Sequence, residues 1–521
     1  MILLILILIL IAGGILSWIS GRTHPTLSRW IAALAVLSDF FIVLYIWIFC
    51  ATANVSDING WIIEYNHRWI GRFGIQFHLA VDGLSVILLI LAYFLGTLTV
   101  FVSRTQVSHK TGLFHLNLLW VLAGISGVFL SVDLFLFYFF WEVMLVPMYF
   151  LIGIWGSGNR INAAYKFFIF TQLSGLLMFL AILLLYFIHA AQTGVYTFDY
   201  RELIHTNLSK PASILLFLGF IIAFFVKLPV IPFHSWLPDA YTEAPTGGSI
   251  LLAGLLSKTA VYGLMRFAVP LFPDAGRLFS PFLMALGAAT ILYGAKLAFA
   301  QTDIKRIMAY ASLSHMGFIL IGIFAYNELA YQGVIMQIIA HAITIGALFI
   351  LAGALQERNH SLDIGEYSGL WSKAPKMGGT GLIFILAMLG LPGMAGFVAE
   401  FLTLAGAFQA NVLITAIASA GFIVSVIYAL KIFQRIFYGE IRDRKISRDF
   451  NVKEIFIMIP LIVVIFWLGL FPGAVFRISE KPVQLLLEHS TTSANQNKTV
   501  PDIRSAGWSY PLKDDKTETE P

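Results

Sequence analysis

Long apolar segments recur along almost the whole chain of 521 residues, and they constrain its fold more than any other feature. About twenty apolar residues in a helix suffice to cross the hydrocarbon core of a bilayer. Hydrophobic residues make up 59% of the sequence and charged residues only 12%. A helix satisfies its backbone hydrogen bonds internally, as a lipid environment requires. The pattern predicts an all-α polytopic membrane protein with about fourteen transmembrane helices.

The apolar windows place the predicted helices along the chain. No basic segment precedes the first window, so we expect a retained helix there rather than a cleaved signal peptide. The residues after the last window are polar and predict a disordered tail outside the membrane. The predicted helices cover residues 1–20, 29–50, 80–103, 113–131, 133–153, 167–189, 213–238, 246–268, 282–301, 306–325, 330–355, 377–409, 413–436 and 454–473.

Lysine and arginine are unevenly shared between the loops on the two sides of the predicted bundle. One set of loops includes Arg104, Lys305 and the stretch 442–448, whereas the opposite loops carry few basic residues before the C-terminal tail. Cytoplasmic loops of membrane proteins are enriched in these residues. The basic loops are therefore predicted to be cytoplasmic, which places both termini on the outer side.

Cysteine content limits the chemistry that the chain can carry. Cys50 is the only cysteine, which excludes disulfide bonds within the chain and iron–sulfur clusters held by its thiolates. The sequence also lacks the glycine-rich fingerprint of a dinucleotide-binding βαβ unit. We therefore expect no cofactor in this chain, so that any electron transfer takes place in another polypeptide.

Two of the predicted helices contain a Leu-Pro dipeptide in the middle and near a charged residue, Lys227 in one and Glu400 in the other. The seventh, over 213–238, contains Pro229 and Pro232, and the twelfth, over 377–409, contains Pro392. Proline removes a backbone donor and breaks a helix, which at membrane depth is tolerated only beside protein or a hydrated cavity. We therefore expect helices 7 and 12 to be broken.

The two broken helices are five helices apart in the predicted order. Copies of an odd number of helices insert in opposite orientations, which is the inverted-repeat plan of many secondary transporters. We therefore expect two inverted five-helix repeats, helices 4–8 and helices 9–13. The predicted organisation is helices 1–3 in 1–112, the two repeats in 113–268 and 282–437, a cytoplasmic loop with helix 14 in 438–475, and the external tail in 476–521.

Four lysines lie inside predicted helices rather than in loops. Lys227 and Lys258 lie near the middle of helices 7 and 8. A cation at the bilayer centre costs at least about 2.5 kcal/mol on insertion scales, so a lysine there indicates an ion or proton path. The alternative is a buried ion pair that only fixes helix packing. Lys296 and Lys431 lie closer to cytoplasmic helix ends, where their amines can reach the interface.

Acids and histidines lie at similar depth. Glu142 in helix 5 is the natural counter-charge for Lys227, and such a pair titrates as a unit. Glu400 lies in helix 12, and His315 and His341 lie in helices 10 and 11. Either histidine alone is compatible with a hydrogen-bonded packing role, and the two together could ligate a haem. Their position between a buried lysine and a buried glutamate instead favours a proton relay. Lysine and histidine carry protons and are poor sodium ligands, so we expect protons to move along this line.

Several stretches resemble the signature sequences of the antiporter-like membrane subunits of respiratory complex I. The resemblance rests on residues 82–85, 227–249, 251–266, 303–317 and 390–401 and spans roughly 80–440. In most members a histidine follows Pro-Asp-Ala, where this chain has Tyr241, so a role for that position is in doubt. Glu400 separates the chain from the L-type and N-type subunits, which place a lysine there.

The resemblance implies roles, partners and a location. The family passes electrons from NADH through flavin mononucleotide and iron–sulfur clusters to quinone in partner subunits, so this chain would hold none of these groups and would pump protons. The expected partners are L-type and N-type membrane-arm subunits in a bacterial inner membrane, with both termini periplasmic. By this resemblance the uptake half contains Glu142, Lys227 and Lys258, the connecting relay His315 and His341, and the outer half Glu400.

Other kinds of protein are compatible with the same residues. One is a subunit of an Mrp-type cation/proton antiporter or of a membrane-bound hydrogenase, which neighbouring genes for redox and quinone-site subunits would separate from a complex I subunit. Another is a structural subunit whose buried charges only hold helices together. The sequence also leaves open whether Lys296, Lys431, His234 and Tyr241 transfer protons.

Overall fold

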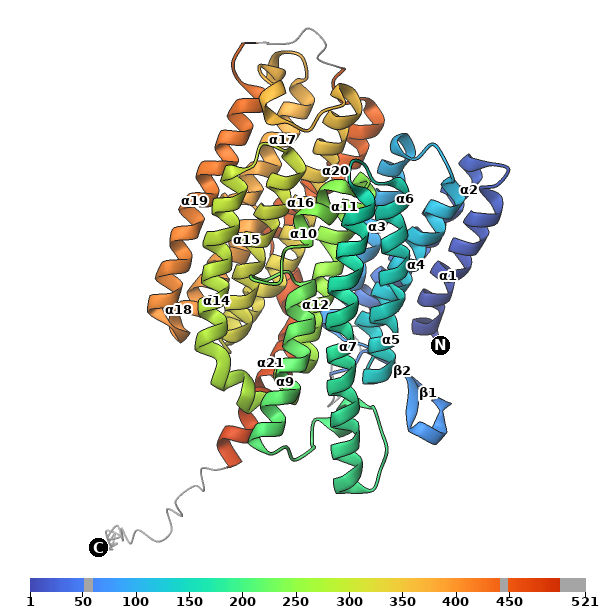
Figure 1. The fold of residues 1–521 in the computed structure, drawn as a ribbon, viewed down its shortest axis with the longest axis vertical. Coiled ribbons are helices and arrows are strands. Elements are labelled where there is room, and N and C mark those ends of the chain that lie inside the picture. The colour runs from blue at the N-terminus through green and yellow to red at the C-terminus, as the bar shows by residue number, and fades with distance from the viewer. Residues whose placement is uncertain (51–59, 441–447, 497–521) are drawn as a thin grey trace, which may run out of the picture.

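The computed structural model describes residues 1–50, 60–440 and 448–496 and is a bundle of long helices (Figure 1). Thirteen helical segments of this described part are long and apolar enough to cross a membrane, which confirms a polytopic helical membrane protein. They are α1 (Ile2–Ser20), α2 with the π-helical turn after it (Pro25–Cys50), α3 (Gly83–Gln106), α4 (Thr111–Leu130), α5 (Leu134–Val143) with α6 (Leu145–Trp155), α7 (Arg160–Thr193), α9 (Lys210–Lys227), the segment Thr246–Leu271, α14 (Pro273–Ala300), α15 (Ile304–Phe324), α16 (Glu328–Asn359), α19 (Val412–Phe437) and α20 (Val452–Leu470).

The predicted twelfth helix consists of two shorter helices. α17 (Pro375–Met388) and α18 (Ala395–Ala410) are separated by a loop that contains Pro392. Gly390 and Gly393 have φ angles of 64° and 94° in this loop, a left-handed conformation that favours glycine. The break expected from proline is therefore present, and the two glycines shape it.

The predicted seventh helix ends earlier than expected. α9 ends at Lys227 and regular helix resumes only in α10 (Leu237–Glu243), so the prediction of helix up to residue 238 is wrong. Pro229 and Pro232 lie in the turns between them, where each lacks a backbone donor. Lys227 is therefore the last residue of a helix that stops inside the bundle.

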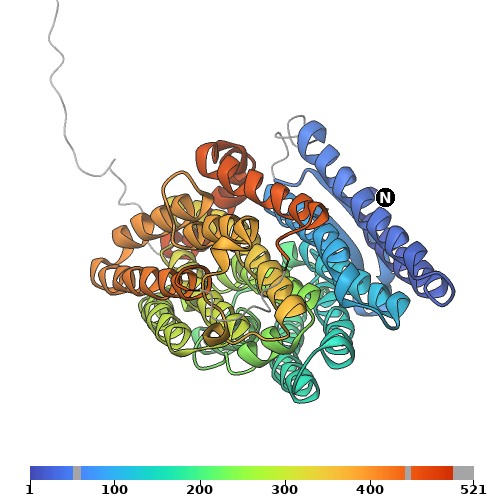
Figure 2. The ribbon, with the colours of Figure 1, turned by 90° about the horizontal axis from the view of Figure 1, so that it is seen from above.

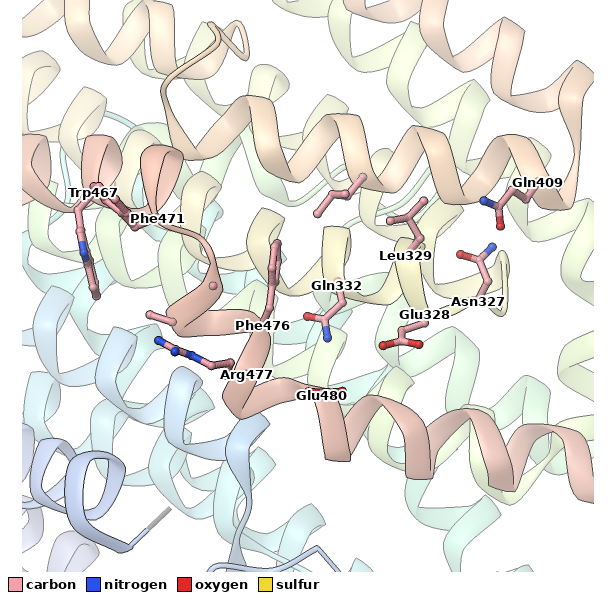
Figure 3. Close-up of a pocket in the computed structure, with 13 residues that line it drawn as sticks. Asn327, Glu328, Leu329, Gln332, Gln409, Trp467, Phe471, Phe476, Arg477 and Glu480 are labelled. Carbon is pink, nitrogen blue, oxygen red and sulfur yellow. The ribbon is translucent and has the colours of Figure 1, made fainter. Parts of the chain in front are cut away.

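The most deeply buried elements run through the middle of the bundle. The segment Thr246–Leu271, α15 and α16 are almost entirely enclosed by other parts of the chain. The first of these is irregular, because α12 (Ser257–Gly263) is flanked by the π-helical segments η3 (Leu252–Leu256) and η4 (Leu264–Ala268). In the view from above, α1 and α2 lie at one edge and the orange helices α18 and α19 lie toward the other (Figure 2).

A two-stranded antiparallel hairpin, which the apolar windows did not reveal, precedes α3. It pairs β1 (Ile63–Ile70) with β2 (Ile75–Val81). The ring of His78 on β2 lies 2.8 Å from Asp199 Oδ2 and 2.8 Å from Glu64 Oε1. Burial raises the pKa of Asp199, but hydrogen bonds from His78 and Arg201 outweigh burial and hold that pKa at about 2. The ionised Asp199 therefore helps tie the hairpin to the loop before α8 (Tyr200–Leu203).

Residues predicted as a disordered tail are helical up to Gln496. α21 (Gly473–Gln496) packs against α3, α14 and α16. Val475, Ser479, Val483 and Leu486 recur every three or four residues and form its buried face. The prediction of a polar, disordered tail is therefore wrong for residues 476–496, because a narrow apolar face is hidden among polar residues. The remainder, 497–521, lies outside the described residues.

The start of α1 and the end of α21 both point toward the lower end of the bundle in Figure 1. This arrangement agrees with two termini on the same side. Which side of the membrane they face stays a prediction. The proposed segment boundaries and the two inverted repeats also stay predictions.

Candidate functional site

Four of the predicted site residues form one continuous chain through the interior. Lys258 Nζ lies 2.7 Å from His341 Nδ1. The rings of His341 and His315 follow with centroids 5.6 Å apart, and His315 Nδ1 lies 3.2 Å from Glu400 Oε1. All four side chains are buried, with Lys258 completely inaccessible. Groups from α12, α15, α16 and α18 thus meet in a row that protons can follow.

The irregular helix around Lys258 supplies its remaining hydrogen bonds. Lys258 Nζ donates to the carbonyl of Ala253 at 2.8 Å and lies 3.2 Å from Ser257 Oγ. Ala253 belongs to the π-helical segment η3 (Leu252–Leu256), and π turns disturb the regular pairing of helix carbonyls. A buried amine therefore finds a backbone acceptor within its own helix.

A hydrogen-bond donor and a hydrogen-bond acceptor both lie near His315 Nδ1. Gln337 Nε2 lies 3.2 Å away, the same distance as Glu400 Oε1. A neutral imidazole nitrogen can accept from the amide or donate to the carboxylate, but it cannot do both. The proton position on His315 therefore decides which of the two neighbours it binds.

A small cavity of about 20 Å³ lies beside the two histidines and Glu400. That volume admits about one water molecule. Several polar atoms around it have no hydrogen-bond partner within the described residues: His315 Nε2, Gln337 Oε1, His341 Nε2, Thr344 Oγ1 and Glu400 Oε2. These polar side chains therefore surround one small cavity that the two histidines share with the carboxylate.

Sequence reasoning missed Gln337 and Thr344, which line this cavity. They lie four residues before and three residues after His341 on α16. Residues at these spacings share one face of a helix, but neither is charged, so the spacing from His341 is the one sequence signal that relates them to the site. It also missed Asp39 of α2, a buried acid whose carboxylate oxygens find no partner among the described residues.

The broken helix α17–α18 holds Glu400 in place. Gly390 lies in the break, and a Cβ at this position would come within 2.6 Å of Glu400 Oε2. Tyr428 of α19 interacts electrostatically with the same carboxylate, and its buried hydroxyl has no partner within the described part of the chain. The carboxylate is therefore packed closely on one side and faces the cavity on the other.

Glu142 and Lys227 form a second group. Lys227 Nζ lies 3.6 Å above the ring of Trp141 and 3.4 Å from its carbonyl oxygen. Glu142 interacts electrostatically with Lys227 and is bonded by Tyr138 and Gln172 rather than directly by the lysine. The predicted pair is therefore close, but the backbone and ring of Trp141 are the nearest neighbours of the amine.

A glycine on α7 makes room for Glu142. A Cβ at Gly175 would lie 2.5 Å from Glu142 Oε1. That oxygen is buried and has no hydrogen-bond partner among the residues that the structure describes. The structure shows no hydrogen bond that joins Lys227 to Lys258 within those residues, so the six predicted residues form two separate groups.

The four residues whose part in proton transfer the sequence left open lie in different surroundings. Lys296 is exposed, as an amine that reaches the interface would be. Lys431 lies 3.6 Å above the ring of Phe299 and lines a cavity of about 110 Å³ together with Tyr428. The hydroxyl of Tyr241 donates to the carbonyl of Leu252 at 3.2 Å. His234 packs edge-on against Tyr293.

Asp239 connects the broken seventh helix to its neighbours. Its two oxygens lie 2.7 Å from Lys166 Nζ and 2.6 Å from an Arg306 nitrogen. These contacts tie α10 to α7 and to α15, which belong to different predicted repeats. Within the described residues, no three His, Cys, Asp or Glu side chains gather as a metal site would require.

The fold and the buried row define a polytopic membrane protein with two interrupted helices beside a line of titratable side chains. Residues 131–427 match the family described as NADH:quinone oxidoreductase/Mrp antiporter, TM. NADH-quinone oxidoreductase subunit M of Pseudomonas aeruginosa is 48% identical over 91% of this chain and 95% of its own length. Subunit M of Escherichia coli K12 is 46% identical over 92% of this chain and 96% of its own length. The chain belongs to the family of NADH-quinone oxidoreductase subunit M.

Solved structures agree with this family. A chain of respiratory complex I from Thermus thermophilus with bound NADH superposes with a TM-score of 0.84 at 31% identity, over 94% of this chain and all of that one. A chain of the Mrp complex from Dietzia has a TM-score of 0.80 over 94% of this chain and 52% of its own, but at 21% identity this likeness concerns the fold alone.

Proposed function

We propose that this chain is a proton-translocating membrane-arm subunit of NADH:quinone oxidoreductase, in which electron transfer from NADH to quinone drives proton pumping. The observation that carries the proposal is the buried chain from Lys258 through His341 and His315 to Glu400. Each member gains and loses a proton readily enough to act as a donor and acceptor in turn. Family membership supplies the redox partner that the chain itself lacks.

The geometry supports a stepwise relay. A protonated Lys258 donates its proton to His341 Nδ1 along their 2.7 Å contact, and His341 releases a proton from Nε2 into the cavity. His315 takes up a proton at Nε2 and releases one from Nδ1 to Glu400 Oε1. Both Nε2 atoms lack other partners within the described residues. Each imidazole then holds the opposite tautomer, and rotation of the rings returns the row to its starting state for the next proton.

Glu142 and Lys227 form the uptake part of the proposed path. Because the two side chains interact electrostatically without direct contact, the charge of one changes the proton affinity of the other. Pro229, Pro232 and Pro392 lack backbone donors and keep the adjacent helices interrupted, and in this proposal water enters at the two breaks. Uptake and release would then occur beside the two breaks.

The remaining features of the proposal concern partners and location. We infer that helices 4–8 and 9–13 act as two inverted repeats, and that L-type and N-type subunits are neighbours in a bacterial inner membrane. Flavin, iron–sulfur clusters and quinone belong to partner subunits, and this chain holds no cofactor. The basic loops face the cytoplasm, so both termini are periplasmic.

A subunit of another respiratory or antiporter complex is the competing function. A chain of an archaeal membrane-bound sulfane sulfur reductase has a TM-score of 0.80 at 26% identity over 91% of this chain. The fold alone therefore does not separate these complexes. The 46–48% identity to subunit M of two bacteria favours the quinone reductase.

Replacement of Lys258 by methionine tests the proposed relay. Methionine keeps the length of the side chain but carries no proton, so Lys258→Met should depress both proton pumping and quinone reduction by the purified, reconstituted complex. Lys296→Met is the matched control, because that amine is exposed, and it should pump normally. An assembled Lys258→Met complex with normal pumping and normal quinone reduction would show that the buried charges only hold the helices together.

A further inference from the structure

A groove of about 870 Å³ opens between α2, α3, α16 and α20. Its volume lies within the range of about 300–1,000 Å³ that is typical of ligand pockets. The part of the groove at membrane depth is apolar and partly aromatic. It is lined there by Leu37, Phe40, Phe94, Phe101, Ile350 and Phe456.

One end of the groove is polar. Arg104 and Gln106 lie at the end of α3, Glu357 lies in the last turn of α16, and Lys453 and Glu454 lie at the start of α20. Because these helix ends meet at one surface of the bundle, the polar residues lie at a membrane interface. The groove therefore has an apolar body and a charged end, as an amphipathic ligand requires.

The acids at the charged end already have partners. Glu454 accepts two hydrogen bonds from Arg358 Nη2 at 2.7 and 2.8 Å. Glu357 accepts from the hydroxyl of Thr105 at 2.8 Å. Arg104 and Lys453 are exposed, and neither donates a hydrogen bond or forms an ion pair to another described residue. Arg104 and Lys453 therefore remain without an ion-pair partner among the described residues, and Glu357 is the one carboxylate of the described groove lining that is not paired with a cation.

We propose that this groove binds one glycerophospholipid with an anionic headgroup. The acyl chain lies along Phe40, Phe94 and Phe456, and the phosphate and the headgroup face Arg104 and Lys453. A transmembrane helix of a partner would have to bury both cations, which costs free energy unless it brings its own acids. An anionic lipid satisfies them at the interface, where lipid phosphates already lie.

The expected size of the preference follows from the two cations. A lysine or arginine near an anionic membrane surface contributes about 1 kcal/mol, which corresponds to about a fivefold change in binding. Two such residues should therefore give a preference for an anionic over a zwitterionic headgroup of at least about fivefold. By the orientation proposed above, the lipid belongs to the cytoplasmic leaflet.

The experiment uses the intact complex in nanodiscs with photoactivatable phosphatidylglycerol or phosphatidylcholine that carry the same diazirine acyl chain. Mass spectrometry of labelled peptides around Phe40 and Phe456 measures occupancy of the groove. We expect labelling by phosphatidylglycerol to exceed labelling by phosphatidylcholine at least about fivefold. The double variant Arg104→Gln/Lys453→Gln should abolish this preference.

A matched control replaces two exposed lysines outside the groove, Lys373→Gln/Lys376→Gln, and should keep the preference. Leu37→Trp should fill the groove and reduce labelling by both lipids. Equal labelling by the two lipids in the parent complex, or an unchanged preference in the Arg104/Lys453 variant, would overturn the proposal. So would a photoreactive phenylalanine analogue at Phe456 that crosslinks a partner polypeptide instead of lipid.

Discussion

In the proposed relay, the role of each buried residue depends on whether its side chain can exchange a proton. Glu400 ends the buried chain, with one oxygen 3.2 Å from His315 and the other without a partner among the described residues. A counter-charge would need only to be negative. A proton carrier must instead change its charge during each cycle.

Substitutions of Glu400 separate these two roles. Glu400→Gln keeps the shape but cannot titrate, so it should lower the pumping rate about tenfold or more. Glu400→Lys should retain part of the activity because lysine also exchanges protons, and Glu400→Asp should fall between them. Pumping by reconstituted complexes, measured against assembly on native gels, provides the comparison. Normal pumping by the glutamine variant with an inactive lysine variant would identify Glu400 as a structural counter-charge.

A double variant tests whether Glu142 and Lys227 act as one unit. Lys227→Ala and Glu142→Ala should each nearly abolish pumping and depress quinone reduction, because a coupled complex stalls when one proton step stalls. Residues that act together give non-additive losses. The double variant should therefore pump no worse than either single variant. Losses that multiply in the double variant would mean that the two residues serve separate steps.

Charged residues at membrane depth could be predicted from the sequence, whereas their uncharged neighbours could not. Lys258, His341 and Glu400 are recognisable because a titratable group is costly in an apolar window. Gln337 carries no charge, and amides are common in helix packing, so nothing in its type marks it as a neighbour of His315. The separation of Lys227 from Glu142 by Trp141 also depends on side-chain directions that spacing does not fix.

Interrupted helices determine where these residues lie. Pro229, Pro232 and Pro392 predicted both breaks, because the loss of a backbone donor is a local property of proline. The π-helical turns around Lys258, the hairpin of β1 and β2 and the buried face of α21 were not predicted. Each of these depends on packing against distant parts of the chain, which no apolar window contains.

Gly390 allows a direct test of the break between α17 and α18. Its φ of 64° costs a non-glycine residue about 1–3 kcal/mol, and a Cβ would come within 2.6 Å of Glu400 Oε2. Gly390→Ala should therefore lower thermal stability and reduce pumping severalfold. Gly379→Ala in α17 is the control, because a Cβ there meets nothing within 4 Å, and it should leave both unchanged. A fully active Gly390→Ala complex would contradict a positioning role for the break.

At the scale of the whole molecule, the two groups of titratable residues are separate, but ion pairs connect elements of the two predicted repeats. Asp239 links α10 to α7 and α15 through Lys166 and Arg306, and α7 and α15 belong to different predicted repeats. The direction of transport, however, depends on which face of the bundle meets the cytoplasm. That direction follows only from the distribution of basic loops.

Accessibility of single cysteines in intact cells tests the orientation. Cys50→Ser first removes the only native cysteine. Ser108 lies in the loop between α3 and α4, and Ser209 lies just before α9; both side chains are exposed. If the basic loops are cytoplasmic, a membrane-impermeant maleimide should label Ser209→Cys in intact cells and should label Ser108→Cys only after permeabilisation. The opposite pattern would place both termini in the cytoplasm, and the proposed uptake and release sides of the relay would have to be exchanged.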